Sequence, residues 1–267
     1  MRYFGGCDVG STYGKCVILD ENGKMVSNAT VRSKISSVDT ANMALDEAIG
    51  KSGGCIREVK DLSYLVGTGY GRNKVLFADE NISEISCHAM GVHITDPSVT
   101  AIIDIGGQDV KGISVDKDGT VRNFAMNDKC AAGTGRFFEA MAAAFEMDLD
   151  QFSLLSLKAK NVIPITAQCS VFAESEVISL VAENKPKEDI AAGIELAVAK
   201  RCFVMAKKAG TDGNITMTGG CAKNKGLQKA LEHVLKKKVV ELSIDPQLMG
   251  ALGAAEYARQ KGMAKQN

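Results

Sequence analysis

The sequence predicts an α/β fold made of two similar lobes, and an internal repeat is the main observation behind this prediction. Each copy has an apolar stretch that ends at an aspartate, then a glycine turn, a lysine, a second apolar stretch and a polar turn. The copies align without a gap, and the matching pairs are Asp8 with Asp104, Gly10 with Gly106, Lys15 with Lys111, Asp20 with Asp116, and Gly23 with Gly119. Each copy therefore predicts two strands joined by a tight turn.

The first half of the chain alternates predicted strands and helices. Apolar periodicity predicts strands at 3–9, 15–20 and 61–66 and helices at 38–49 and 84–92. The Asp20–Gly23 segment predicts a hairpin turn in which Asn22 and Gly23 supply the positive φ values. Gly67–Arg72 predicts a flexible loop after the third strand.

The second half opens with the second hairpin and continues with the same alternation. Periodicity predicts strands near 121–126, 162–167, 215–217 and 239–242, and helices at 137–145, 190–209, 225–235 and 250–261. A further long helix is predicted to open at Cys169 and Ser170, with core-facing side chains at Phe172, Val177, Ile178 and Val181.

The repeat places the lobe boundary near Pro97. We expect a first lobe at 1–96, with the closing helix 250–261 packed back on it. The second lobe covers 97–267.

The composition excludes several classes of function. The chain has 267 residues, 45% of them hydrophobic, no net charge, no tryptophan and 5% aromatic residues. Such a chain has no electrostatic or stacking surface for nucleic acid. Apolar runs stay well short of the ~18 residues of a membrane span, and no signal-peptide pattern opens the chain. We expect a soluble, cytoplasmic protein that binds neither nucleic acid nor membrane.

The repeated turns predict a polyphosphate site. Glycines let backbone N–H groups approach phosphate oxygens, and a lysine supplies a cation. Candidate phosphate-binding residues are Gly10, Ser11, Thr12, Tyr13 and Lys15 in the first copy and Gly106 and Gly107 in the second. Asp8 and Asp104 are candidate Mg²⁺ ligands that, with Gln108, would orient an attacking water. A single Asp-x-Gly is an ordinary turn about as often as it is a phosphate site, but two aligned copies favour phosphate binding.

A third glycine site, Thr218-Gly219-Gly220, falls between a predicted buried strand and a helix. Glycines there let a flat ring approach the backbone, so Gly219 and Gly220 are candidates for binding adenosine, although a Gly pair often marks only a turn. Further candidates for the nucleotide are Gly133, Gly135, Asn224 and Gln247.

This ordered trio of sites resembles the superfamily of actin, Hsp70 and the sugar kinases, which implies two ribonuclease-H-like lobes with ATP in the cleft. A narrower resemblance rests on longer motifs: DVGSTYGK, TGYGR, SEISCHAMG, DIGGQDVK, MNDKCAAGTGRF, VFAESEVIS, MTGG and GALGAAEYA. These are similar to the ATP-dependent activators of 2-hydroxyacyl-CoA dehydratases and to the related benzoyl-CoA reductase subunits. The similarity is weaker over 27–60 and at Cys221–Lys223.

The resemblance implies a homodimer that holds one [4Fe–4S] cluster between its subunits. The two cysteines that each chain would contribute are Cys130 and Cys169. Both precede predicted helices, whose N-termini stabilise thiolates. Four others, Cys7, Cys16, Cys87 and Cys202, are expected to be buried hydrophobes, and Cys55 is expected to be a loop thiol. Cys221 lies too near the expected adenosine to join the cluster. His88 and His93 are not spaced as a metal pair, and we expect them to be surface or satisfied core residues.

The resemblance also implies the activity. Ferredoxin or flavodoxin would reduce the cluster, and ATP hydrolysis would drive one electron onto a partner dehydratase. The alternatives are another iron–sulfur partner, such as a benzoyl-CoA reductase-like or double-cubane protein, a small-molecule kinase of the same superfamily, or an actin-like or chaperone-like ATPase.

Overall fold

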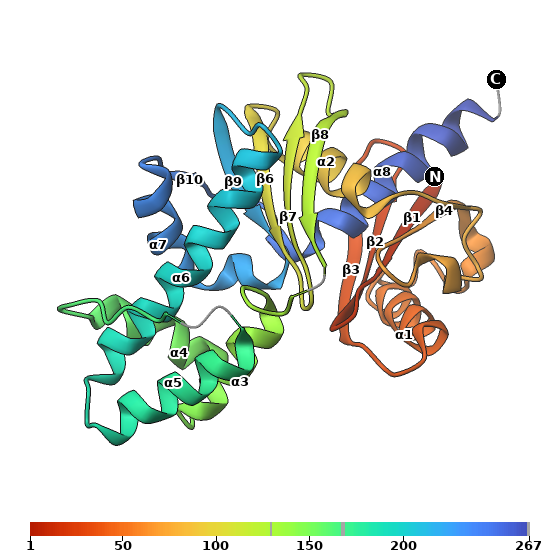
Figure 1. The fold of residues 1–267 in the computed structure, drawn as a ribbon. Helices are drawn as coiled ribbons and strands as arrows, with labels where there is room; N and C mark the ends of the chain where they lie inside the picture. The colour runs from red at the N-terminus through yellow and green to blue at the C-terminus, as the bar shows by residue number, and fades with distance from the viewer. Residues whose placement is uncertain (129, 167–168, 266–267) are drawn as a thin grey trace. The chain divides into compact units, whose positions relative to one another are not determined.

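The computed structural model describes residues 1–128, 130–166 and 169–265, which form two compact units (Figure 1). Unit 1 comprises Met1–Ser98, Val115–Val121 and Leu242–Asn267, and unit 2 comprises Val99–Ser114 and Arg122–Glu241. Each unit is built around one five-stranded sheet.

The sheet of unit 1 has the order β3-β2-β1-β4-β5. Its strands are β1 (Tyr3–Val9), β2 (Tyr13–Asp20), β3 (Met25–Arg32), β4 (Leu62–Thr68) and β5 (Glu80–Asn81). The first three strands are antiparallel neighbours, whereas β4 and β5 run parallel to β1. The sequence pattern missed β3, whose side chains alternate only in part between buried and exposed positions.

The sheet of unit 2 repeats this topology with the order β8-β7-β6-β9-β10. Its strands are β6 (Val99–Ile105), β7 (Val110–Val115), β8 (Val121–Asn127), β9 (Asn214–Thr218) and β10 (Val239–Val240). The register repeats as well, because Asp8 pairs with Lys15 in one hairpin and Asp104 pairs with Lys111 in the other. The predicted two-copy α/β fold is confirmed.

Eight helices connect the strands within the described ranges of the chain. They are α1 (Ser37–Gly50), α2 (Glu84–Thr95), α3 (Gly135–Ala144), α4 (Leu149–Leu155), α5 (Ser170–Ala182), α6 (Lys187–Lys208), α7 (Lys225–Leu235) and α8 (Met249–Ala264). All the predicted helices are present, and α4 is an additional one. None of the helices in the described part of the chain is both long and apolar enough to cross a membrane.

The predicted strand at 162–167 is wrong for its described residues. Residues 162–166 form no strand, and Ala167 lies outside the described residues. The segment is instead tied to α6: the N–H of Ile163 donates to the carbonyl of Asp189 at 3.1 Å. Pro164 cannot donate to a sheet ladder, which explains why an apolar stretch of this length stays outside one. The strand predicted at 239–242 is also shorter than expected, since β10 ends at Val240.

Two further local predictions are wrong. Asn22 keeps a negative φ, and only Gly23 takes a positive φ, of 80°, so the hairpin turn is not of the primed type.

In α5, Val177 is buried and Val181 half-buried, but Phe172 and Ile178 are exposed. This helix is apolar on more than one face, and α3 and α6 cover only one of them.

The alternation of side chains along β1 decides what each face of the first sheet contacts. Cys7 and Val9 pack with α1, whereas Phe4 packs with α2 and α8. Since side chains alternate across a strand, Asp8 shares the face of Phe4 and lies on the side covered by α2 and α8. The packing of these two helices therefore sets the surroundings of Asp8.

Glycines allow α2 and α8 to approach closely. A Cβ on Gly253 would lie 1.8 Å from the carbonyl oxygen of Cys87, and one on Gly91 would lie 2.1 Å from that of Met249. Backbone atoms cannot move aside as a flexible side chain can, so a side chain at either position would separate the helices.

We predict that Gly253→Ala lowers the free energy of unfolding by roughly 1–3 kcal/mol, because its methyl group overpacks this crossing. Gly50→Ala is the matched control, since a Cβ there meets nothing within 4 Å. Urea unfolding measures both. Equal stabilities of the two variants would contradict this account of the crossing.

Candidate functional site

The two glycine turns have the same backbone geometry. The N–H of Gly10 donates to the carbonyl of Tyr13 at 3.1 Å, and the N–H of Gly106 donates to that of Asp109 at 3.0 Å. The far turns of the hairpins match as well, with Gly23 at a φ of 80° and Gly119 at 82°. The repeat seen in the sequence is thus a repeat of structure.

A buried ion pair stands at the end of the central strand in each unit. In unit 1, Lys15 Nζ lies 2.8 Å from Asp8 Oδ2. In unit 2, Lys111 Nζ lies 3.2 Å from Asp104 Oδ2 and 2.7 Å from Asp109 Oδ1. Asp8 and Asp104 are only 4% and 2% exposed. Each lysine pairs with its buried carboxylate, and carboxylate oxygens are the ligands that Mg²⁺ prefers.

A Thr-Gly pair beside each aspartate is a third repeated feature, which the sequence reasoning recognised only in the second copy. Thr68 pairs with Asp8 across β4 and β1, and Thr218 pairs with Asp104 across β9 and β6. The next residue is a glycine with positive φ in both units, 89° at Gly69 and 82° at Gly219. The recurrence of Thr-Gly after an apolar stretch was the available signal.

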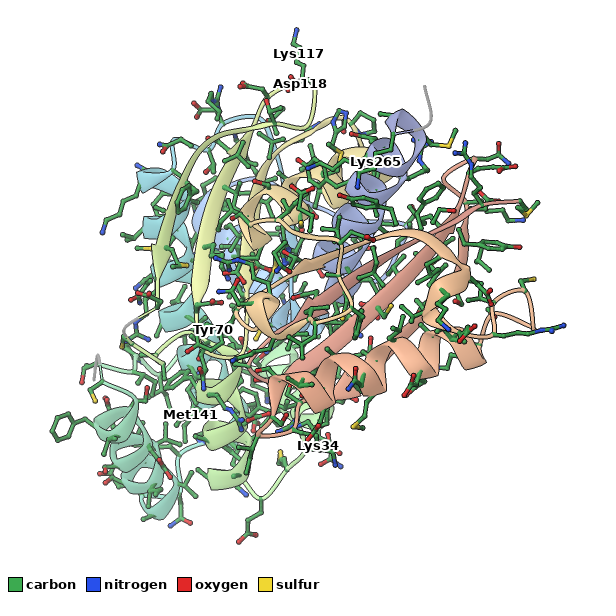
Figure 2. The ribbon with its side chains drawn as sticks, turned by 90° about the vertical axis from the view of Figure 1, so that its right-hand side faces the viewer. Lys34, Tyr70, Lys117, Asp118, Met141 and Lys265 are labelled. Atoms are coloured by element: carbon green, nitrogen blue, oxygen red, sulfur yellow. The ribbon has the colours of Figure 1, made fainter. Side chains whose placement is uncertain are left out.

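These two glycines let the loop backbone touch the aspartates. A Cβ on Gly69 would lie 2.3 Å from Asp8 Oδ1, and one on Gly219 would lie 3.0 Å from Asp104 Oδ1. Tyr70, next along the loop, is exposed (Figure 2). The Thr-Gly segments thus form part of the surroundings of both carboxylates.

The remaining residues predicted in the turns differ in their exposure and in the contacts that they already make. The Thr12 hydroxyl is buried and has no hydrogen-bond partner among the described residues, as expected of a group that meets a ligand. Gln108 is exposed. Tyr13 is already engaged, because the guanidinium of Arg32 lies 5.3 Å from its ring centre and donates to its hydroxyl.

Gly135 lies beside the second glycine turn, whereas a Cβ on Gly133 would face Arg201 on α6. The N–H groups of Gly135 and Arg136, at the start of α3, donate to the carbonyls of Gly106 and Gly107 at 2.9 and 3.0 Å. Gly133 has a φ of 103°, which only glycine adopts readily. The turn that would hold phosphate and the first turn of α3 are therefore one hydrogen-bonded unit.

The residues predicted for adenosine, Gly219 and Gly220, and the further nucleotide candidates Asn224 and Gln247 lie in different parts of the structure. Gly219 and Gly220 open the short helical turn at the end of β9. The Asn224 side chain caps α7 by accepting from the N–H of Leu227 at 2.9 Å, and it donates to Glu195 Oε1 at 2.8 Å. Gln247 is buried in unit 1 and belongs to a separate part of the chain from these three.

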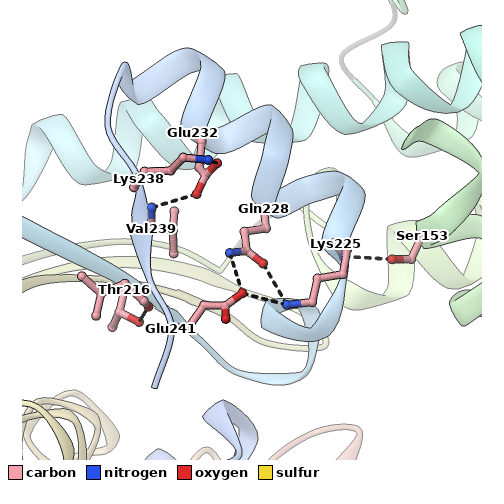
Figure 3. Close-up of polar contacts among 9 residues, drawn as sticks. Ser153, Thr216, Lys225, Gln228, Glu232, Lys238, Val239 and Glu241 are labelled. Carbon is pink, nitrogen blue, oxygen red and sulfur yellow. Dashed lines mark hydrogen bonds and ion pairs between the residues drawn. The ribbon is translucent and has the colours of Figure 1, made fainter. Parts of the chain in front are cut away.

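Polar contacts fix the helix that follows this loop (Figure 3). The N–H of Lys225 donates to Ser153 Oγ at 2.9 Å, and its Nζ lies 3.0 Å from Glu241 Oε1. At the other end of α7, Glu232 accepts from the N–H of Val239 at 3.1 Å. The start of α7, which follows the Gly219-Gly220 turn in the chain, is thereby held in place.

The cysteines divide by exposure. Cys130 and Cys169 are exposed in unit 2, and Cys55 is exposed in unit 1. Burial raises the pKa of the Cys16, Cys87 and Cys202 thiols to about 12, and it also raises the pKa of the Cys7 and Cys221 thiols. Thiolates are the metal-binding form, so burial disfavours metal ligation at these five positions.

Cys169 is the N-cap residue of α5, and Cys130 precedes α3. In the parts of the chain that the structure describes, no three histidine, cysteine or acidic side chains gather to form a metal site.

Two buried polar residues were missed by the sequence reasoning as parts of these surroundings. His88, expected at the surface or in the core, is 6% exposed and lies on α2, on the side of Asp8. Glu195 is 1% exposed on α6, next to Asn224, and its Oε2 has no hydrogen-bond partner among the described residues. Burial raises the pKa of the Glu195 carboxyl to about 8. His88 lies within the SEISCHAMG motif, which was the available signal, whereas nothing marked Glu195 beyond its polar residue type.

We predict that Glu195 makes the protein less stable as the pH rises. The folded-state pKa, about 8, exceeds the ordinary value of 4.5, so between these values only the folded state holds the proton. The free energy of unfolding therefore falls as the pH rises through this window. Glu195→Gln should be more stable than the wild type at pH 9 by roughly 1–3 kcal/mol and similar to it near pH 5.

Urea unfolding at several pH values measures this effect, with the exposed Glu183→Gln as the control that keeps the wild-type pH dependence. A Glu195→Gln variant whose stability followed the wild type at every pH would show that the carboxyl stays charged.

Comparison with known proteins agrees with this geometry. The chain is 45% identical to an activator of lactoyl-CoA dehydratase from Anaerotignum propionicum, over 97% of this chain and 98% of that protein. It is 44% identical to a 2-hydroxyisocaproyl-CoA dehydratase activator from Clostridioides difficile, over 96% of this chain and 94% of that protein.

A solved structure of the activator of the 2-hydroxyisocaproyl-CoA dehydratase from Clostridium difficile, with bound ADPNP, superposes with a TM-score of 0.93 at 42% identity. The match covers 99% of this chain and 97% of that one. A glucokinase from Streptomyces griseus shares the fold alone, with a TM-score of 0.60 at 13% identity. The family pattern matches residues 6–258. The chain therefore belongs to the BadF/BadG/BcrA/BcrD ATPase family.

Proposed function

We propose that this protein is an ATP-hydrolysing iron–sulfur activator that passes one low-potential electron from ferredoxin or flavodoxin to a 2-hydroxyacyl-CoA dehydratase. The observation that carries the proposal is the 45% identity to a dehydratase activator over almost the whole of both chains. The repeated Asp-Lys turns and the exposed cysteines support the two halves of that activity, ATP hydrolysis and electron transfer.

For ATP hydrolysis, we assign the phosphates to the two glycine turns. The backbone N–H groups of the turns and the ammonium group of Lys15 would meet the phosphate charge, and the free hydroxyl of Thr12 offers a further donor. Asp8 and Asp104 would hold Mg²⁺, directly or through its waters, and would orient the attacking water together with Gln108. Mg²⁺ fits these positions because both carboxylates stand at strand ends beside glycine turns and have lysines to balance their charge.

For electron transfer, the thiols of Cys130 and Cys169 are the ligands that suit a cluster. They are exposed at or near the starts of helices, where the helix dipole stabilises a thiolate. A [4Fe–4S] cluster needs four thiolates, so two copies of the chain would each supply two. When bound, the cluster would accept and release a single electron.

The hydrogen bonds between the second glycine turn and α3 offer a route for coupling the two halves. The carbonyls of Gly106 and Gly107 accept from the first N–H groups of α3, and Cys130 lies a few residues before that helix. A phosphate that moved this turn would also move the start of α3 and the segment that carries Cys130. Nucleotide state would thereby bias the exposure and the docking surface of the redox centre.

We predict that Cys130→Ala protein, prepared without oxygen, loses most of its iron, because one cysteine in each chain leaves the cluster with half its ligands. Cys55→Ala is the matched control, since Cys55 is also an exposed thiol. Iron and sulfide content per dimer measures both. A full complement of iron in the Cys130→Ala protein would remove this residue from the ligand set.

We predict that Asp104→Asn lowers the ATPase kcat by about 100-fold or more, since it removes a charge that the reaction needs beside the phosphates. Its iron content should equal that of the wild type. The control is Asp150→Asn, at an exposed position in the first turn of α4. Hydrolysis at the wild-type rate by Asp104→Asn would exclude the aspartate from the catalytic role.

A further inference from the structure

We propose that His88 is a positioning residue for Asp8, which it holds in the orientation needed for ATP hydrolysis. This inference rests on the proposed function, and it adds to the site a residue from α2, outside both hairpins. His88 acts through the carboxylate and does not itself touch the nucleotide.

The first observation is the position of His88. A Cβ built on Gly250 would lie 2.9 Å from Asp8 Oδ2 and also 2.9 Å from His88 Nε2. The carboxylate and the imidazole therefore face the same small space above the first turn of α8. Gly250 keeps this space free of a side chain, so the two groups can be neighbours.

The second observation is an asymmetry between the two copies of the repeat. In unit 2 the hydroxyl of Thr218 donates to Asp104 Oδ1 at 2.8 Å. In unit 1 the matching residue, Thr68, donates to the carbonyl of Ile82 at 2.9 Å instead. Asp8 thus lacks the hydroxyl donor that orients Asp104, and besides Lys15 the fold supplies the imidazole of His88 near it.

The third observation is the burial of the whole group. Asp8 and His88 are 4% and 6% exposed, and Lys15 Nζ lies 2.8 Å from Asp8 Oδ2. The charges of Asp8 and Glu84 raise the pKa of the neighbouring Cys87 thiol, and the charge of Arg72 lowers it. At this depth water cannot substitute for a missing donor, so removing the imidazole should leave Asp8 less well oriented.

The test compares two substitutions at His88 by steady-state ATPase kinetics. His88→Leu fills the space without a hydrogen-bond donor, and His88→Gln restores an N–H group. We expect His88→Leu to lower kcat at least tenfold with KM for MgATP within twofold of the wild type. His88→Gln should recover kcat to within about threefold of the wild type, because a donor again faces the carboxylate.

The control is His93→Gln, since His93 lies on the same helix but packs against Gly119. It should keep wild-type kinetics. Thermal unfolding of each variant separates positioning from folding, and His88→Ala serves as a second variant without a donor if His88→Leu does not fold.

A folded His88→Leu or His88→Ala protein with the wild-type kcat would overturn the inference. Equal losses of kcat in the Leu and Gln variants would also overturn it, because a role in packing alone predicts no rescue by a donor. Absence of ATPase activity in the wild type would instead refute the proposed function, and this inference with it.

Discussion

The buried Asp-Lys pair at the end of each central strand is the constraint on which the rest of the structure depends. Removing one partner from such a pair costs roughly 3–5 kcal/mol, because the other charge is left without compensation. The chain uses this pair twice, at Asp8 with Lys15 and at Asp104 with Lys111. Each pair flanks a tight glycine turn, and each is bordered by a Thr-Gly loop. The repeat therefore preserves a chemical arrangement as well as a strand order.

The two copies differ in what surrounds them, and the differences suggest a division of tasks. In unit 1 the face of Asp8 is covered by α2 and α8, whose close crossing depends on Gly91 and Gly253. In unit 2 the glycine turn is bonded to the start of α3, which follows Cys130. The first copy is thus packed against a closely crossed pair of helices, whereas the second is connected to the segment that carries a proposed cluster ligand.

The sequence predicted those features that depend on local pattern. The hairpins followed from the repeat, and α7 matched its predicted bounds because its apolar face and its Asn224 cap are local signals. Features set by tertiary packing escaped it. The apolar segment at 162–166 bonds to α6 and joins no sheet, and Phe172 is exposed because the neighbours of α5 cover a single face. His88 came to lie near Asp8 through the register of α2 on α8, which no local pattern encodes.

The central claim is the proposal that the Asp-Lys turns of each chain bind one nucleotide. Titration calorimetry with Mg²⁺ and a non-hydrolysable ATP analogue tests it most directly. One binding site per chain is predicted, and Lys15→Met should weaken it by about tenfold, as the loss of a charge-assisted contact requires. Two independent sites per chain, or a Lys15→Met protein that binds with unchanged affinity, would contradict the account.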